Sequence, residues 1–287
     1  MRKILAKSLF LPPYNNYNIY RGCTHGCIYC DSRSKCYEIE LPFENITVKT
    51  NAVELARCEL SKKRNPIMVN SGSMCDPYMP IEAQLELSRN VLKVVLEYGH
   101  GAGFLTKNIL ALRDLDLMVK INIKAKAIAC FTLTTVDDHL AKIIEPNASL
   151  PSERLKALRQ FADAGITTGV WMTPLLPFIT ANVDNVKAIV AACAMALVKY
   201  IHIFEIGTSM REGSRDFFYN NLDRLFPGMK ERYQQTYGLK YICLAPEHEK
   251  LEKVFRDECD KYGIVYLKED IANLRQIPKH SQQLSLF

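Results

Sequence analysis

The sequence predicts an α/β fold, an incomplete (βα)6 TIM-like barrel with a C-terminal α/β extension. The chain has 287 residues, which is enough for one barrel-sized domain and a small appendage. Six short apolar runs alternate with amphipathic helical stretches, and this alternation indicates parallel βαβ units with right-handed crossovers. The runs are apolar on both faces, as parallel strands between helices must be. An open doubly wound sheet fits the same periodicity.

The expected elements follow in chain order. Strands are expected at residues 16–20, 67–70, 103–106, 127–132, 167–172 and 200–205. Helices, in which apolar residues recur at helical spacing, are expected at about residues 81–98, 110–118, 152–164 and 183–198. Thr135, with Asp138 three residues later, forms a capping pattern after the fourth strand. Gly165 is expected to end the third helix.

The pattern changes after Gly207. We therefore predict a core at residues 1–207, an α/β extension at residues 208–275 and a flexible tail at residues 276–287. Within the extension, a strong helix is expected near residues 247–262.

The composition is that of an ordinary globular enzyme, with 48% hydrophobic and 24% charged residues. A net charge of +6 is compatible either with a mildly basic surface of no special function or with a face that binds a polyanion. No apolar run is long enough to span a membrane, and the N-terminal segment lacks a signal-peptide core and cleavage site. Ten cysteines without a secretory signal indicate a reducing compartment, so we predict a cytoplasmic protein.

Three cysteines, Cys23, Cys27 and Cys30, recur in one short loop after the first expected strand. Thiolates so close together repel one another unless a metal neutralises them. Gly22 and Gly26 permit the sharp backbone path that wraps a compact object. Three ligands for a 4Fe-4S cluster leave one iron open, as in a catalytic metal site, and that iron can bind a cofactor and pass it one electron.

Two other metal sites are compatible with cysteines in this loop. Cys36 could complete a zinc site as the fourth ligand, although zinc sites favour paired Cys-x-x-Cys units. A ferredoxin-type electron carrier needs a fourth cysteine at a different spacing.

The segment from Arg21 to Cys30, with Tyr29 before the third cysteine, resembles the radical S-adenosylmethionine (SAM) superfamily over about residues 14–206. Within that superfamily it is most similar to the spore photoproduct lyase-like proteins. That similarity also rests on residues 71–82, 105–107, 113–114 and 145–146 and on Arg154.

The resemblance implies a 4Fe-4S cluster and SAM as cofactors, with an electron donor such as flavodoxin or ferredoxin. It also implies SAM contacts at the carboxyl ends of the strands. The family's Gly-Gly-Glu is absent here, and Asp76 either supplies its negative charge or caps the turn before Pro77. The implied contacts are Tyr29 and Met172, with Trp171, for the adenine; Ser71, Gly72 and Ser73 for the ammonium; Lys107 and Arg154 for the carboxylate; and Thr132 or Thr134 for the ribose or carboxylate.

Cys75 is the candidate catalytic residue. Lyases that resemble this chain return a hydrogen atom from a cysteine thiol to the product radical. Cys75 lies in the loop after the second expected strand, where that donor belongs, although Ser73 is an alternative for the equivalent position.

The last five residues are similar to the peptide by which bacterial repair and replication proteins bind the sliding clamp. Such a peptide binds in an extended form through two apolar anchors and a polar residue that orients it. The alternative is a segment that folds back on its own domain. The five residues are Gln283, Leu284, Ser285, Leu286 and Phe287.

Together these features predict a radical SAM enzyme that cleaves SAM reductively to a 5′-deoxyadenosyl radical. The resemblance suggests a lyase that acts on a DNA photolesion, and hence DNA repair. The alternatives are a radical SAM enzyme for a small molecule or peptide, and a zinc-stabilised DNA-associated adaptor without enzymatic activity.

Overall fold

The computed structural model describes residues 4–7, 15–39 and 42–278. They form one seven-stranded sheet in the order β1-β2-β5-β6-β7-β8-β9. The parallel strands of this sheet stand side by side in the order in which they occur in the chain. In a doubly wound sheet, by contrast, the strand order reverses at a switch point. The incomplete barrel is therefore confirmed, and the doubly wound alternative is wrong. The parallel strands are β2 (Asn15–Tyr17), β5 (Met68–Ser71), β6 (Gly101–Thr106), β7 (Ala127–Thr132), β8 (Thr167–Trp171) and β9 (Tyr200–His202).

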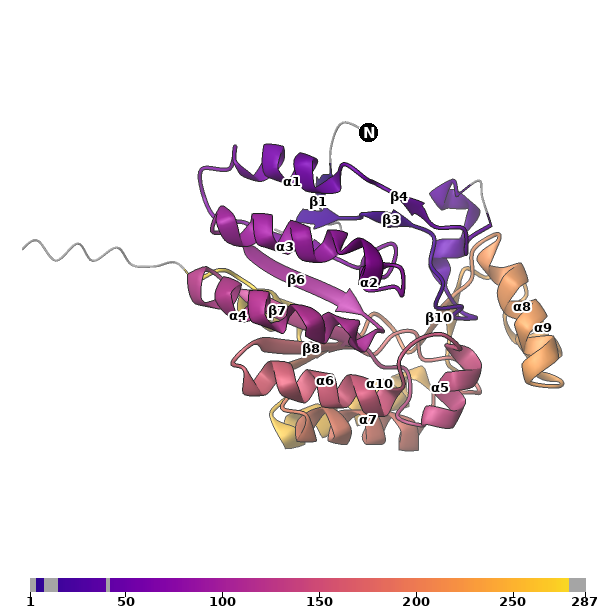
Figure 1. Ribbon diagram of the computed structural model, residues 1–287. Coiled ribbons are helices and arrows are strands. Elements are labelled where there is room, and N and C mark those ends of the chain that lie inside the picture. The colour runs from indigo at the N-terminus through magenta and orange to yellow at the C-terminus, as the bar shows by residue number, and fades with distance from the viewer. Residues whose placement is uncertain (1–3, 8–14, 40–41, 279–287) are drawn as a thin grey trace, which may run out of the picture.

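Helices cover the outer face of this sheet, and the main hydrophobic core lies between the two layers (Figure 1). Phe104, Phe131 and Phe161 pack edge to face or tilted at its centre, with ring centroids 5.6 to 6.3 Å apart. The outer helices are α1 (Ala52–Leu60), α3 (Leu87–Glu97), α4 (Leu115–Lys124), α6 (Pro151–Asp163), α7 (Val183–Met195) and α10 (His248–Tyr262).

Several boundaries differ from those expected. The first expected strand divides into β2 and β3 (Tyr20–Arg21), and β3 pairs with β4 (Thr47–Val48) outside the main sheet. The expected helix at residues 81–98 divides into α2 (Glu82–Leu85) and α3, because Glu86 adopts a left-handed conformation with φ of 49°.

Two further helices also begin differently. The segment Ile109–Asp114 is a 3-10 helix before α4. Asp137, rather than Thr135, caps α5 (Asp138–Ile144) by accepting from the backbone N–H groups of residues 139 and 140. The hydroxyl of Thr135 accepts from the backbone N–H of Asp137 instead. The short antiparallel edge strand β1 (Leu5–Lys7) was not expected.

The C-terminal part of the chain packs against two separate parts of the barrel domain. A two-stranded sheet, β10 (Gly207–Ser209) and β11 (Ile242–Leu244), together with α8 (Ser214–Leu225) and α9 (Met229–Tyr237), packs against the cysteine loop. That loop continues into two short 3-10 helices, Asp31–Arg33 and Lys35–Tyr37. By contrast, α10 packs on the barrel helix α7.

The inner face of the sheet is covered by α11 (Lys268–Leu274). Ile271 packs there against Met68, Ile128 and Tyr200. Arg275, just after α11, donates to the hydroxyl of Tyr200 and, at 3.3 Å, to Oδ1 of Asn70. Side chains of α11 and Arg275 therefore occupy the interior of the barrel.

In the described part of the chain, no helix is long and apolar enough to cross a membrane. The expected clamp-binding pentapeptide, Gln283 to Phe287, lies outside the described residues.

Candidate functional site

A pocket lies at the carboxyl ends of β5, β6 and β7, beside the cysteine loop. Its lining joins segments far apart in the sequence. Ten of the expected site residues line it: Cys23, Cys27, Tyr29, Cys30, Gly72, Ser73, Cys75, Asp76, Lys107 and Thr132.

The cysteine loop is held by backbone hydrogen bonds from outside itself. The N–H of Cys23 donates to the carbonyl of Phe43 at 2.9 Å, and that of Ile28 donates to the carbonyl of Ile144 at 3.0 Å. Gly22 has a φ of +85°, and a Cβ on it would lie 2.4 Å from the Phe43 carbonyl oxygen. Only glycine fits this turn without distortion.

The three cysteines fit an iron–sulfur cluster. All three face one pocket, and Cys27 is buried. Burial raises the pKa of Cys23 well above its usual value and that of Cys27 to about 12. Such thiols ionise only beside a strong positive centre, which a cluster supplies. Cys36 is outside the pocket lining, and its sulfur accepts from Arg211 at 3.2 Å, so its placement does not support a zinc site.

A buried Glu–Arg–Tyr set holds the end of the loop. The Tyr29 hydroxyl donates to Oε1 of Glu145, and Arg154 donates to Oε2 of Glu145 at 2.5 Å. Burial would raise the pKa of Glu145, but the charges of Arg154 and Lys107 and the hydrogen bonds lower it, so the group is a carboxylate. The ring of Tyr29 is thereby fixed at the pocket wall.

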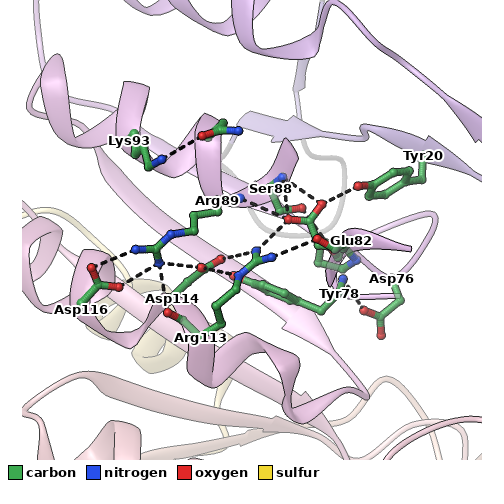
Figure 2. A network of polar contacts seen from close by, with 12 residues as sticks. Tyr20, Asp76, Tyr78, Glu82, Ser88, Arg89, Lys93, Arg113, Asp114 and Asp116 are labelled. Atoms are coloured by element: carbon green, nitrogen blue, oxygen red, sulfur yellow. Dashed lines mark hydrogen bonds and ion pairs between the residues drawn. The ribbon is translucent and has the colours of Figure 1, made fainter. Parts of the chain in front are cut away.

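A second Glu–Arg–Tyr set holds the start of the loop, as Figure 2 shows. The Tyr20 hydroxyl donates to Oε2 of Glu82, and Arg113 donates to Oε1 of Glu82 at 2.7 Å. Backbone N–H of Ser88 donates to both carboxylate oxygens at 3.1 Å. Arg113 also pairs with buried Asp114 at 2.9 Å, and Asp114 pairs with Arg89 of α3 at 2.9 Å, so the network extends to that helix.

Asp76 connects the loop after β5 to the cysteine loop. Its Oδ2 lies 3.0 Å from Nε2 of His25 and accepts from the backbone N–H of Lys107 at 2.7 Å. Its Oδ1 accepts from the hydroxyl of Thr106 at 2.6 Å. Although burial opposes ionisation, the His25 charge and these hydrogen bonds lower the pKa of Asp76 to about 2. Both oxygens are occupied by protein donors.

Gly72 lets two strands meet closely at the pocket. Its φ is +98°, and a Cβ there would lie 2.0 Å from the carbonyl oxygen of Leu105. Lys107, half-buried at the end of β6, places its ammonium 5.7 Å from the ring centroid of Tyr29. Burial would lower the pKa of Lys107, but nearby Cys27 and Glu145 raise it, so this side chain stays cationic.

The expected contacts outside the pocket lining are Ser71, Arg154 and Met172, together with Trp171 and the alternative Thr134. Ser71 hydrogen-bonds Tyr17 on the outer side of β5. Arg154 is 1% exposed and donates to the carbonyls of Ser149 and Thr132 as well as to Glu145. Met172 is packed in the outer core, since side chains alternate between faces of a strand and Trp171 takes the inner face. The placement of Ser71, Arg154 and Met172 favours structural roles.

Cys75 lies in the pocket with a protonated thiol. Its sulfur donates to the carbonyl oxygen of Tyr20 at 2.8 Å. Burial, together with the charge of Asp76, raises the pKa of Cys75 to about 12. A thiol that keeps its hydrogen at neutral pH is chemically able to donate a hydrogen atom.

Glu82, Glu145 and Arg113 hold the loop in place, and they belong to the sequence blocks that resemble the family. The sequence alone indicates no role for them, because Glu and Arg are rarely fully buried and a single sequence does not show burial. Their positions in the sequence could nevertheless have indicated a place near the site, because Glu82 follows β5, Arg113 follows β6 and Glu145 follows α5.

Comparisons with known proteins agree with this geometry. A family model described as the radical SAM superfamily matches residues 17–190. An uncharacterised protein of Mycobacterium bovis is 27% identical over 79% of this chain and 68% of its own length. An uncharacterised protein of Methanocaldococcus jannaschii is 30% identical over 56% of this chain and 60% of its own. A protein of Pseudomonas phage M6, named radical SAM Nalpha-GlyT isomerase, is 24% identical over 64% of this chain and 36% of its own.

Among solved structures, spore photoproduct lyase complexed with dinucleoside spore photoproduct aligns with a TM-score of 0.69. The alignment covers 93% of this chain and 79% of that one, at 17% identity. At this identity the likeness shows a shared fold.

Proposed function

Because the chain belongs to the radical SAM superfamily, we propose that it is a carbon–carbon lyase acting on a photolesion in DNA. Enzymes of the superfamily carry a 4Fe-4S cluster and use SAM, so this chain is a radical SAM enzyme with those cofactors. The observation that carries the lyase proposal is the Cys75 thiol, protonated and inside the pocket of the cysteine loop. The fold shared with spore photoproduct lyase supports it.

The proposed roles follow from the pocket. Cys23, Cys27 and Cys30 hold the cluster. When bound, the cluster supplies one electron to the SAM sulfonium, which gives methionine and a 5′-deoxyadenosyl radical. Cationic Lys107 suits the SAM carboxylate, and the hydroxyl of Thr132, on the inner face of β7, suits the ribose.

The remaining roles concern the ammonium and the adenine of SAM and the radical of the lyase product. Gly72 and Ser73 line the pocket together with Asp76, and in this proposal their backbone carbonyls accept from the ammonium. Tyr29, fixed by Glu145, suits the adenine. Cys75 gives its hydrogen atom to the product radical, so that the S–H bond breaks, a C–H bond forms and the unpaired electron is left on the Cys75 sulfur as a thiyl radical.

Anaerobic reconstitution tests the radical step. The protein is loaded with iron and sulfide, reduced and given SAM, and 5′-deoxyadenosine is measured. We expect formation in the wild type and in Cys58→Ala, an exposed cysteine outside the pocket, and loss in Cys23→Ala, Cys27→Ala and Cys30→Ala. Lesion-containing DNA or dinucleoside spore photoproduct then tests the lyase. 5′-Deoxyadenosine without lesion repair would refute the lyase and leave a radical SAM enzyme for another substrate.

Three partners belong to this proposal. Flavodoxin or ferredoxin would supply the electron, DNA would carry the lesion, and the sliding clamp would bind the last five residues. Deleting residues 283–287 should abolish capture by a purified clamp and leave 5′-deoxyadenosine formation intact; capture that survives the deletion contradicts this interaction. A cytoplasmic location stays a prediction.

A further inference from the structure

The carboxyl ends of β8 and β9 carry a second group of ring side chains. Trp171 ends β8, His202 ends β9, and Phe204 follows two residues later. The His202 ring centroid lies 4.8 Å from that of Trp171 and 4.7 Å from that of Phe204. We call these three residues the aromatic wall. None of them is among the residues that line the cysteine pocket.

The aromatic wall stands at the level of the proposed SAM site. Thr132, Trp171 and His202 are paired in register across β7, β8 and β9. Residues paired in a parallel sheet point to the same face, so all three belong to the inner face. Two strand spacings separate Thr132 from His202, roughly 10 Å. The aromatic wall therefore borders the same barrel mouth from its far side.

His202 is a buried polar side chain whose ring nitrogens have no hydrogen-bond partner among the described residues. Its side chain is 1% exposed, and in the part of the chain that the structure describes neither Nδ1 nor Nε2 has a hydrogen-bond partner. An unpaired buried polar group lowers stability unless something else pairs with it. Phe204, by contrast, is 40% exposed, so the wall reaches solvent at the mouth.

We propose that the aromatic wall binds a base of the substrate, a planar nitrogen heterocycle carrying carbonyl and N–H groups, and that His202 hydrogen-bonds the edge of this base. The inference rests on the proposed function. A neutral imidazole has one donor and one acceptor, which suits a ring carbonyl or a ring N–H. The rings of Trp171 and Phe204 offer stacking to any base. Burial and the positive charges of Arg275 and Lys268 lower the pKa of His202 to about 4, so the imidazole is neutral at neutral pH.

The assignment to the substrate rather than to the adenine of SAM follows from position. SAM is proposed at the cysteine pocket, lined from β5, β6 and β7. The aromatic wall lies beyond it on β8 and β9, and its outermost ring is exposed, as an approach by a large substrate requires.

Trp171 is the only tryptophan in the chain, so its fluorescence reports on the aromatic wall directly. Reconstituted full-length protein is titrated with dinucleoside spore photoproduct in the presence of SAM. We expect the dinucleoside to change Trp171 fluorescence beyond any change that SAM causes. His202→Phe, which keeps a ring and loses both nitrogens, should weaken dinucleoside binding about tenfold. His202→Gln should restore most of it, and His100→Gln is the matched control, because buried His100 lies directly before the amino end of β6, at the opposite end of the sheet from the mouth.

The outcomes separate this inference from the proposed function. Dinucleoside binding that depends on His202 supports the aromatic wall even if no 5′-deoxyadenosine forms, a result that would refute the proposed function alone. Normal 5′-deoxyadenosine formation with dinucleoside affinity equal in wild type and both His202 variants overturns the aromatic wall. A rise in the KM for SAM in His202→Phe, without a change in dinucleoside affinity, assigns the ring to adenine and also overturns it.

Discussion

Replacing Arg154 by methionine tests whether the buried Glu–Arg–Tyr set at Tyr29 holds the site together. The side chains of Arg154 and Glu145 are each 1% exposed, and they are joined at 2.5 Å. Removing one partner of such a pair leaves an uncompensated buried charge, which costs about 3–5 kcal/mol. With a urea m-value of roughly 3 kcal/mol/M, the unfolding midpoint should fall by about 1 to 1.7 M.

The matched control lies on the same helix. Arg159 pairs with Asp163 at 2.8 Å, but both side chains are about half exposed. Such surface pairs contribute about 0.5 kcal/mol or less, so Arg159→Met should scarcely move the midpoint. The double variant Glu145→Leu/Arg154→Met should recover much of the loss, because no unpaired charge remains. Equal effects of Arg154→Met and Arg159→Met would show that the buried pair is not what stabilises this region.

Three further predictions follow from the structure. Gly72→Ala should abolish 5′-deoxyadenosine formation, because its Cβ would lie 2.0 Å from the Leu105 carbonyl oxygen at a φ of +98°; an active variant would contradict this backbone conformation. Cys75→Ala should lower lesion repair far more than 5′-deoxyadenosine formation, as product analysis by chromatography can measure, and equal losses would argue against a hydrogen-donor role. His202, facing the charges of Arg275 and Lys268, has a pKa of about 4 when folded and an ordinary value of 6.5. Stability should therefore be full above pH 6.5 and fall by about 2 kcal/mol by pH 5, and His202→Phe should remove this dependence in urea titrations at each pH.

The order of strands could be predicted from the sequence because each parallel strand is a short apolar run between helices. The residues 127–132 are an example: every one is buried, and the observed β7 matches the expected strand. The break at Glu86 could not be predicted, since its left-handed conformation is rare for a residue with a side chain and the apolar spacing continues across it. The strand β1 has only three residues, too few to show a period.

Site residues could be predicted where the chemistry is local and not where it depends on the sheet. The cysteine spacing is contained in one loop, and all three cysteines do line one pocket. Met172 was expected at the adenine, but a shift of one residue along β8 moves a side chain to the opposite face. Similarly, Arg154 was expected to meet SAM, and its three protein acceptors become apparent only when α6 is packed against β7.

The two Glu–Arg–Tyr sets explain why so much buried charge surrounds a loop of eleven residues. Tyr20 lies three residues before the first cysteine of the loop and Tyr29 directly before the third, so the two phenols stand near either end of the cysteine-bearing segment. Each phenol donates to a carboxylate that an arginine also binds; Glu82 and Arg113 follow β5 and β6, whereas Glu145 and Arg154 both follow β7. Apolar contacts would bury the same loop with less desolvation cost, but they are not directional. Hydrogen bonds to a buried carboxylate fix the orientation of the loop as well as its burial. The loop is thereby pinned to successive units of the barrel, which places its cysteines toward the carbonyls near Gly72 and the ammonium of Lys107.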